Sequence, residues 1–367
     1  MSIQYVTDST PRWASAPGAT ILKLLRSRGL TPDDLADQLR LSDPDVRRLI
    51  HGELEINEDL AEGLSTVLGS TATFWCRREE QYRDSVTWLE VDDLVQRSPL
   101  VDLIGRGWVE EASGWRDQAK ALLDYYDVSD AAEWTARWET RLSDVHFRTS
   151  GAYESDDLSL AAWLRQVELR AEEIEVGPWS PSGLRSAIEE LRGFSRISNP
   201  ERFLPLASAT LAQVGVALIA VPATPGNRLS GSAFALESGT RVVGLTARHR
   251  SDDHFWFTLF HELGHLLLHG NQGEFLDTLD ADESGDSVTE SEANAFARDA
   301  LLPHGVDSLR DLRANGPRMR EIIAFANAEG IAPGIVVGRL QYDGVLRHNQ
   351  LQGLIRRFKW EGSTLKT

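Results

Sequence analysis

The chain has 367 residues, 41% of them hydrophobic and 26% charged, which is the composition of an ordinary globular protein with room for two or three domains. Its formal net charge of −18 repels nucleic acid from most of the surface, so any DNA contact has to be local. The single cysteine, Cys76, excludes an internal disulfide framework and is typical of a reducing compartment.

The N-terminus has no basic segment followed by an apolar one, and no apolar run reaches the length of a membrane span. We therefore expect a cytoplasmic protein without a membrane partner.

Residues 1–16 are expected to form a loosely held tail, and five short helices are expected between residues 17 and 84. The second begins strongly at Thr31, because a capping threonine is followed by a proline and two acids that suit the first helical turn. Ser42 caps the third, which runs through Ile50 and leaves a tight turn between the two helices. This pattern predicts a helix-turn-helix arrangement.

The same segment resembles the HigA-like branch of the Xre/Cro repressor family, and the resemblance implies a domain over residues 17–84. Short pieces spread along the segment carry it: Pro17-Gly18, Gly29-Leu30-Thr31, Leu35-Ala36, Leu49-Ile50-His51-Gly52, Leu60-Ala61, Leu68-Gly69, Phe74-Trp75 and Tyr82.

The third helix would be the recognition helix, with Asp45, Arg47 and Arg48 as the expected contacts to operator DNA. Carboxylates at Asp43 and Asp45 oppose phosphate, and residues 17–84 hold nine basic and thirteen acidic side chains, a net of −4. The alternative is a helical domain kept for homodimerisation or for binding a partner.

Residues 85–180 are expected to form a helical connector, rich in tryptophans that pack in its core. The run Gly177-Pro178-Trp179-Ser180-Pro181-Ser182 indicates a boundary, so a second domain is expected over residues 181–367.

Three buried strands are expected in this second domain, at residues 214–222, 229–236 and 241–245. The edge strand of such a sheet can pair with an extended peptide. Ser230 and Gly231 fall on the strand that best fits this role, and we expect them to bind substrate.

Residues 252–269 are expected to form a helix that carries the sequence H-E-x-x-H. Positions i and i+4 share one helix face, so His261 and His265 can direct two imidazole nitrogens at one Zn²⁺ ion. Glu262 stands beside them, where it can act as the general base toward a water molecule.

A third ligand is expected from the following helix, residues 290–302, where periodicity does not choose between Glu290 and Glu292. His269 is a rival, but an unbroken helix carries it about 6 Å beyond His265. It is expected to be a packed or capping histidine.

The second domain resembles the ImmA/IrrE zinc metallopeptidases over residues 180–345. Three motifs carry the resemblance, and the first is H-E-x-x-H at His261. The second is Glu292-Ala293-Asn294-Ala295-Phe296-Ala297 followed by Leu301-Leu302-Pro303. The third is a closing helix, Ile331 to Leu340. The resemblance implies that Glu292 is the third zinc ligand and that the substrate is a protein, an Xre-type repressor whose cleavage derepresses stress or mobile-element genes.

Together these features predict a mainly α fold with a small β-sheet: an N-terminal all-α helix-turn-helix domain, a helical connector and a C-terminal α+β zincin-like metallopeptidase domain. Residues 351–360 are expected to add a final basic helix. The predicted function is that of a zinc-dependent endopeptidase. The alternative is a DNA-binding regulator or antitoxin-type protein whose peptidase-like domain binds a partner or ligand without proteolysis.

Overall fold

The computed structural model describes residues 12–139, 141–142, 157–270, 275–277, 288–310 and 317–367. The chain divides into two compact units, one made of Met1–Leu100 with Val109–Trp134 and the other of Val101–Trp108 with Thr135–Thr367. Most of the expected tail, residues 1–11, lies outside the described residues. The fold is mainly α with a small β-sheet, which confirms the expected class.

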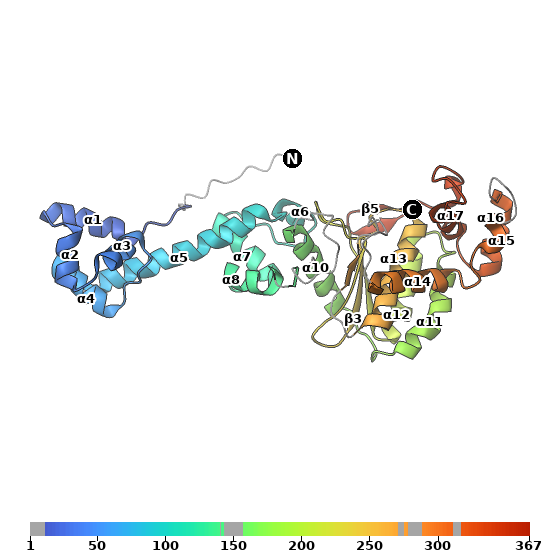
Figure 1. Ribbon diagram of the computed structural model, residues 1–367, viewed down its shortest axis with the longest axis horizontal. Coiled ribbons are helices and arrows are strands. Elements are labelled where there is room, and N and C mark those ends of the chain that lie inside the picture. Colours follow the sequence, from blue (N-terminus) through green and yellow to red (C-terminus); the bar gives the residue numbers. More distant parts are fainter. Residues whose placement is uncertain (1–11, 140, 143–156, 271–274, 278–287, 311–316) are drawn as a thin grey trace. The chain divides into compact units, whose positions relative to one another are not determined.

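The first unit is entirely helical in its described residues (Figure 1). Its helices are α1 (Pro17–Arg28), α2 (Pro32–Leu39), α3 (Asp43–His51), α4 (Glu58–Leu68), α5 (Ala72–Arg97), α7 (Trp115–Tyr126) and α8 (Ala131–Trp134), and α6 (Leu100–Gly105) begins at its boundary.

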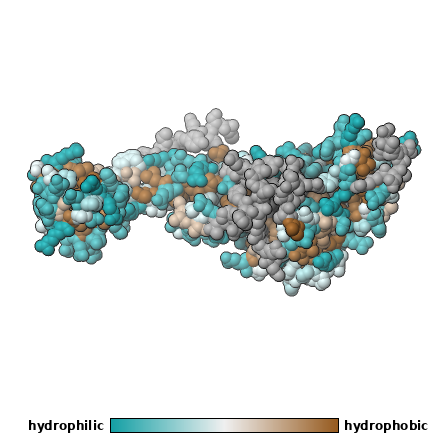
Figure 2. All heavy atoms as spheres, viewed as in Figure 1, coloured by the Kyte–Doolittle hydropathy of each residue, from teal (hydrophilic) through white to brown (hydrophobic). Residues whose placement is uncertain are grey.

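The starts of α2 and α3 follow from local chemistry. Thr31 and Asp34 form a reciprocal capping box at α2, and the Ser42 hydroxyl accepts a hydrogen bond from the backbone N–H of Asp45 at α3. The apolar sides of α1–α5 meet in one core around the fully buried Trp75. Figure 2 shows that hydrophilic side chains cover most of the visible face of α1–α4.

Helix α5 is longer than the short fifth helix expected from the sequence. No glycine or proline interrupts residues 72–97, and the helix ends at Ser98, directly before Pro99. The helix therefore continues well past residue 84.

The second unit is built around a four-stranded sheet with the order β1-β3-β2-β4. Its first three strands, β1 (Val216–Ala220), β2 (Gly231–Ala235) and β3 (Arg241–Leu245), lie inside the ranges expected from the sequence. β1 runs parallel to β3, and β2 is antiparallel to both β3 and β4 (Phe275–Asp277).

Helices cover both faces of this sheet (Figure 1). α10 (Asp157–Glu172) packs on β1 and β3, and the indole N–H of Trp163 donates a hydrogen bond to the backbone oxygen of Val221. α13 (Asp252–His269) packs on β2 and β3 at the other face, where Gly231 meets its side chains. The remaining helices are α11 (Pro181–Phe194), α12 (Pro200–Gln213), α14 (Val288–Leu301), α15 (Asp307–Arg310), α16 (Met319–Glu329) and α17 (Pro333–Tyr342).

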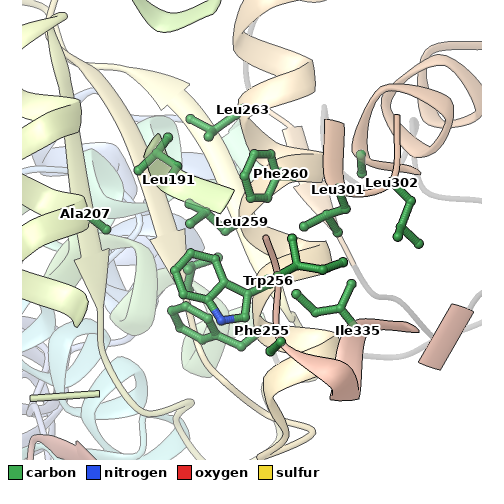
Figure 3. Close-up of a cluster of buried hydrophobic side chains, with 14 of the residues drawn as sticks. Leu191, Ala207, Phe255, Trp256, Leu259, Phe260, Leu263, Leu301, Leu302 and Ile335 are labelled. Carbon is green, nitrogen blue, oxygen red and sulfur yellow. The ribbon is translucent and has the colours of Figure 1, made fainter. Parts of the chain in front are cut away.

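Helix α13 lies at the centre of the main hydrophobic core. Its apolar face presents Phe255, Trp256, Leu259, Phe260 and Leu263 to side chains from the surrounding helices (Figure 3). Because α13 is packed on several sides, its residues are held in fixed orientations.

The prediction of a helix at residues 351–360 is wrong. A short 3-10 turn, Gln352–Leu354, is followed by a hairpin of β5 (Lys359–Glu361) and β6 (Thr364–Lys366). The backbone of Arg356 accepts a hydrogen bond from Asp252 N, and Phe358 N donates to Arg250 O. Tertiary pairing with the segment before α13 thus overrides the local helical pattern.

No single helix in the described parts of the chain meets the length and hydropathy of a membrane span; α16 and α17 meet that test only as a pair, with a bend of 113° between them.

Candidate metal centre

The H-E-x-x-H sequence lies on the buried side of α13. His261, Glu262 and His265 are each at most 1% exposed. The helix spacing brings the two imidazoles together, and their Nε2 atoms are 2.9 Å apart.

Glu290 of α14 completes a three-residue cluster with these histidines. One carboxylate oxygen lies 3.2 Å from His261 Nε2 and the other 3.4 Å from His265 Nε2. The three groups offer ligand atoms that all lie within 4.8 Å of one another, so they are placed to hold one metal ion.

The resemblance implied Glu292 as the third ligand, but the structure places Glu290 and not Glu292 beside the two histidines. The Glu292 carboxylate lies 2.9 Å from His269 Nε2. The face of α14 that packs inward is set by Ala293, Ala297 and Leu301, and Glu290 precedes Ala293 by about one turn on that face. Glu292 therefore lies beside that face, where its carboxylate contacts His269 and not the cluster, and its side chain is 56% exposed.

A glycine on α13 lets α14 come close enough for Glu290 to reach the histidines. A Cβ added to Gly264 would lie 3.0 Å from the Phe296 ring and 3.4 Å from the Cα of Ala293. The glycine inside H-E-x-x-H thus serves the approach of the two ligand-bearing helices.

The Nδ1 atoms of His261 and His265 have hydrogen-bonding partners, and these partners determine whether each Nε2 atom carries a proton or a lone pair. His261 Nδ1 lies 3.1 Å from Oδ1 of Asn294, an acceptor, so the proton belongs on Nδ1 and a lone pair on Nε2. His265 Nδ1 lies 3.2 Å from Nδ1 of His269.

The contact between His269 and Glu292 extends this pattern. His269 donates from Nε2 to the Glu292 carboxylate, and its Nδ1 accepts from His265. Nε2 of His265 then also presents a lone pair to the cluster. Two lone pairs facing each other across 2.9 Å repel unless a cation lies between them, so the donor set fits a metal ion.

Electrostatics keep these groups in the protonation states that bind metal. Burial on its own would raise the pKa of Glu290, but the two imidazoles beside its carboxylate outweigh burial and hold that pKa well below its usual value. Burial lowers the pKa of His265 below its ordinary value, against the opposing effect of Glu290. A carboxylate beside neutral imidazoles is the form that Zn²⁺ prefers.

Glu262 points from α13 toward β2. A Cβ added to Gly231 would clash with Oε1 of Glu262, so only glycine leaves room for this carboxylate. Ser230, the preceding residue, is 3% exposed. The expectation that these residues lie on an edge strand is wrong, because β4 pairs with Gly231–Ala233 on one side of β2 and β3 pairs on the other.

The residues expected to contact DNA lie on the exposed side of α3. Asp45 accepts a hydrogen bond from the Ser42 hydroxyl at 2.7 Å and forms an ion pair with Arg48 at 3.3 Å. The Arg47 guanidinium donates to the backbone oxygen of Asp43 at 3.4 Å. The inward side of α3 is formed by Val46 and Leu49.

Sequence reasoning missed the contacts that hold the histidines. Asn294 lies in the second signature, Glu292 to Ala297, and its place there is the sequence signal for this contact. The stacking of Phe275 on His265, with ring centres 4.3 Å apart, had no signal in the helical pattern, because β4 reaches the site from a separate segment.

Residues 214–324 match the family model Peptidase_M78, described as an IrrE N-terminal-like domain. The matched segment contains the strands of the main sheet, α13 and α14, and so includes His261, Glu262, His265 and Glu290. It supports the peptidase part of the resemblance. No curated protein matches the chain.

Proposed function

We propose that this protein is a zinc-dependent endopeptidase in which His261, His265 and Glu290 hold the ion and Glu262 is the general base. The observation that carries this proposal is the convergence of Glu290 on the two Nε2 atoms within the segment that matches Peptidase_M78. Two imidazoles and one carboxylate are the zinc ligands of a large class of hydrolases.

When bound, the ion would lower the pKa of a water molecule and polarise the scissile carbonyl. Glu262, adjacent to His261 in sequence and buried against Gly231, is placed to take a proton from that water and to pass it to the leaving amine. Asn294 and His269 keep both imidazoles in the tautomer that faces the cluster.

Two measurements test this proposal. Elemental analysis of the purified protein should give close to one zinc per chain, and the double variant His261→Ala, His265→Ala should lose it. Glu262→Gln should keep the zinc and stop cleavage of a protein substrate. Full cleavage by Glu262→Gln would contradict the assigned base.

The proposed substrate is an Xre-type repressor, which the resemblance to the ImmA/IrrE peptidases implies. The test is to express the protein with the Xre-type repressor encoded beside it and to identify fragments by mass spectrometry, with and without a chelator. Stable binding of the repressor without fragments would favour the alternative, a regulator or antitoxin-type protein that does not cleave.

A second proposed activity belongs to α1–α5, namely binding to operator DNA through a helix-turn-helix of the Xre type, with homodimerisation through the same helices. Three residues join α2 to α3, and Arg47 and Arg48 are exposed on α3. Binding should weaken as salt rises and should fall in Arg47→Ala, Arg48→Ala. If that variant binds DNA as tightly as the wild type, these arginines are not the contacts.

A further inference from the structure

A small pocket opens at the N-terminal end of α13, beside the proposed catalytic carboxylate. It lies between the start of β2, the segment that follows β3 and the first two turns of α13. Ser230 and Thr258 line it. Thr258 is about one helical turn before Glu262, and Gly231, next to Ser230, touches Glu262. The pocket therefore adjoins the place where a peptide would be cut.

Two serine hydroxyls in this pocket are buried without a hydrogen-bond partner among the described residues. Ser230 is 3% exposed and Ser251 is 2% exposed, and neither Oγ atom meets a donor or an acceptor. Buried hydroxyls are normally satisfied, and leaving one unpaired is costly. Two such groups line one pocket, and each can donate to an acceptor that enters it.

Ser251 also departs from the usual role of a serine at its position. It is the N-cap of α13, where a serine hydroxyl ordinarily accepts a hydrogen bond from the first turn, but here it makes no such bond. The positive end of an 18-residue helix thus faces the pocket together with a hydroxyl that is available to donate.

The charged groups around the pocket favour an anion. His249 and His254 stack with ring centres 4.3 Å apart, and both line the pocket together with Arg248 and Arg250. No described carboxylate is among the lining residues.

The two acids in the first turn of α13 face elsewhere. Asp252 accepts a hydrogen bond from Arg356 N, and its carboxylate lies against Gly334 of α17. The Asp253 carboxylate lies against Gly338 on the same helix. Neither acid opposes an anion in the pocket.

The geometry points to a specificity pocket that binds a carboxylate of the peptide substrate, with Ser230 and Ser251 as hydrogen-bond donors and the His249–His254 pair beside them. This inference rests on the proposed peptidase function. One helical turn separates Thr258 from Glu262, about 5 Å, and an extended peptide rises about 3.3 Å per residue. The carboxylate therefore belongs to a residue one or two positions from the scissile bond.

The proposed endopeptidase implies that this carboxylate is an aspartate or glutamate side chain, whereas a carboxylate from the C-terminus of the peptide would mean removal of the last residues of the substrate. Four peptide mixtures of randomised sequence separate these sources: one position fixed as Glu or as Gln, each with a free or an amidated C-terminus. Cleavage by the zinc-loaded protein is read by mass spectrometry. Retention of the same mixtures by the Glu262→Gln protein measures binding without turnover.

We expect carboxylate-bearing mixtures to be cut and retained at least about tenfold better than their neutral partners, since charge-assisted hydrogen bonds are at stake. Dependence on Glu identifies a side chain, and dependence on the free terminus identifies the peptide end. The ratio between carboxylate-bearing and neutral mixtures should fall to about one in Ser251→Ala and in His254→Ala. It should persist in His304→Ala, an exposed histidine that contacts Glu329.

Equal retention of all four mixtures, or a carboxylate preference that survives both pocket substitutions, overturns the pocket assignment. Retention is measured on a protein that does not turn over. A carboxylate preference in binding, together with no cleavage by the wild type, would therefore contradict the peptidase proposal while supporting the pocket.

Discussion

The Glu292 carboxylate lies 2.9 Å from Nε2 of His269, so an exposed side chain of α14 fixes a buried imidazole of α13. His269 in turn contacts His265, one of the proposed zinc ligands. Glu292, which the sequence suggested as a metal ligand, therefore acts on the site indirectly. Its hydrogen bond to His269, and that of His269 to His265, orient the imidazole ring of His265.

The first prediction concerns His269. His269→Ala should weaken zinc affinity about 10- to 100-fold, because His265 loses the group that orients its ring and fixes its tautomer. The measurement is competition with a chromogenic chelator, together with the visible absorption of the cobalt-substituted protein. His269→Gln, whose amide oxygen can still accept from His265, should restore part of the affinity. An unchanged affinity and cobalt spectrum in His269→Ala would show that the contact is only packing.

The second prediction compares the two glutamates of α14. Glu290→Gln removes a charged ligand and should cost more zinc affinity than Glu292→Gln, which weakens the contact with His269 but keeps an acceptor oxygen and should cost at most about tenfold. Each substitution replaces one carboxylate by an amide of the same shape, so the pair is its own control. The opposite order of affinities would indicate that Glu292, and not Glu290, binds the metal.

The third prediction tests the contact between β2 and α13. Gly231→Ala should destabilise the protein by about 1–3 kcal/mol and sharply reduce cleavage, because its Cβ meets Glu262 and lies 2.7 Å from Thr258. Gly193→Ala in α11 is the matched control, since its Cβ would meet nothing within 4 Å. Urea unfolding and cleavage rates measure both effects. Full stability and activity in Gly231→Ala would contradict the placement of Glu262.

The fourth prediction concerns Asp252, which is buried at the start of α13. Burial, aided by the nearby charge of Asp253, raises the pKa of Asp252 to about 6 from an ordinary 3.8. The folded state therefore holds this proton more tightly than the unfolded state. The stability that it contributes is present below about pH 4 and is lost as pH rises through about 6, a change of roughly 3 kcal/mol.

Asp252→Asn should remove this loss. The difference in unfolding free energy between the variant and the wild type should shift in favour of the variant between pH 4 and pH 7. Asp299→Asn, at an exposed position of α14, is the matched control. Parallel stability profiles for the wild type and Asp252→Asn would argue against a raised pKa at this position.

Much of the metal centre followed from sequence because its signals are local. The spacing of His261 and His265 fixes their shared helix face, and the capping residues Thr31 and Ser42 mark helix starts that the structure contains. Three buried strands before α13 were also identifiable from their apolar runs.

The missed features depend on contacts between distant segments. The choice between Glu290 and Glu292 depends on which side of α14 is buried. In the sequence Phe296 indicates a buried position as strongly as Ala293 and Ala297 do, but in the structure it is only half buried. β4 covers β2 from a segment beyond α13, so β2 could not be identified as an interior strand. The C-terminal segment pairs with residues more than a hundred positions earlier.

The central claim is that His261, His265 and Glu290 share one zinc ion. Anomalous diffraction at the zinc edge from crystals of the zinc-loaded protein tests it most directly. We expect a single peak about 2.0–2.2 Å from both Nε2 atoms and from a Glu290 oxygen. A peak bound by Glu292 in place of Glu290, or no zinc peak between the two imidazoles, would contradict it.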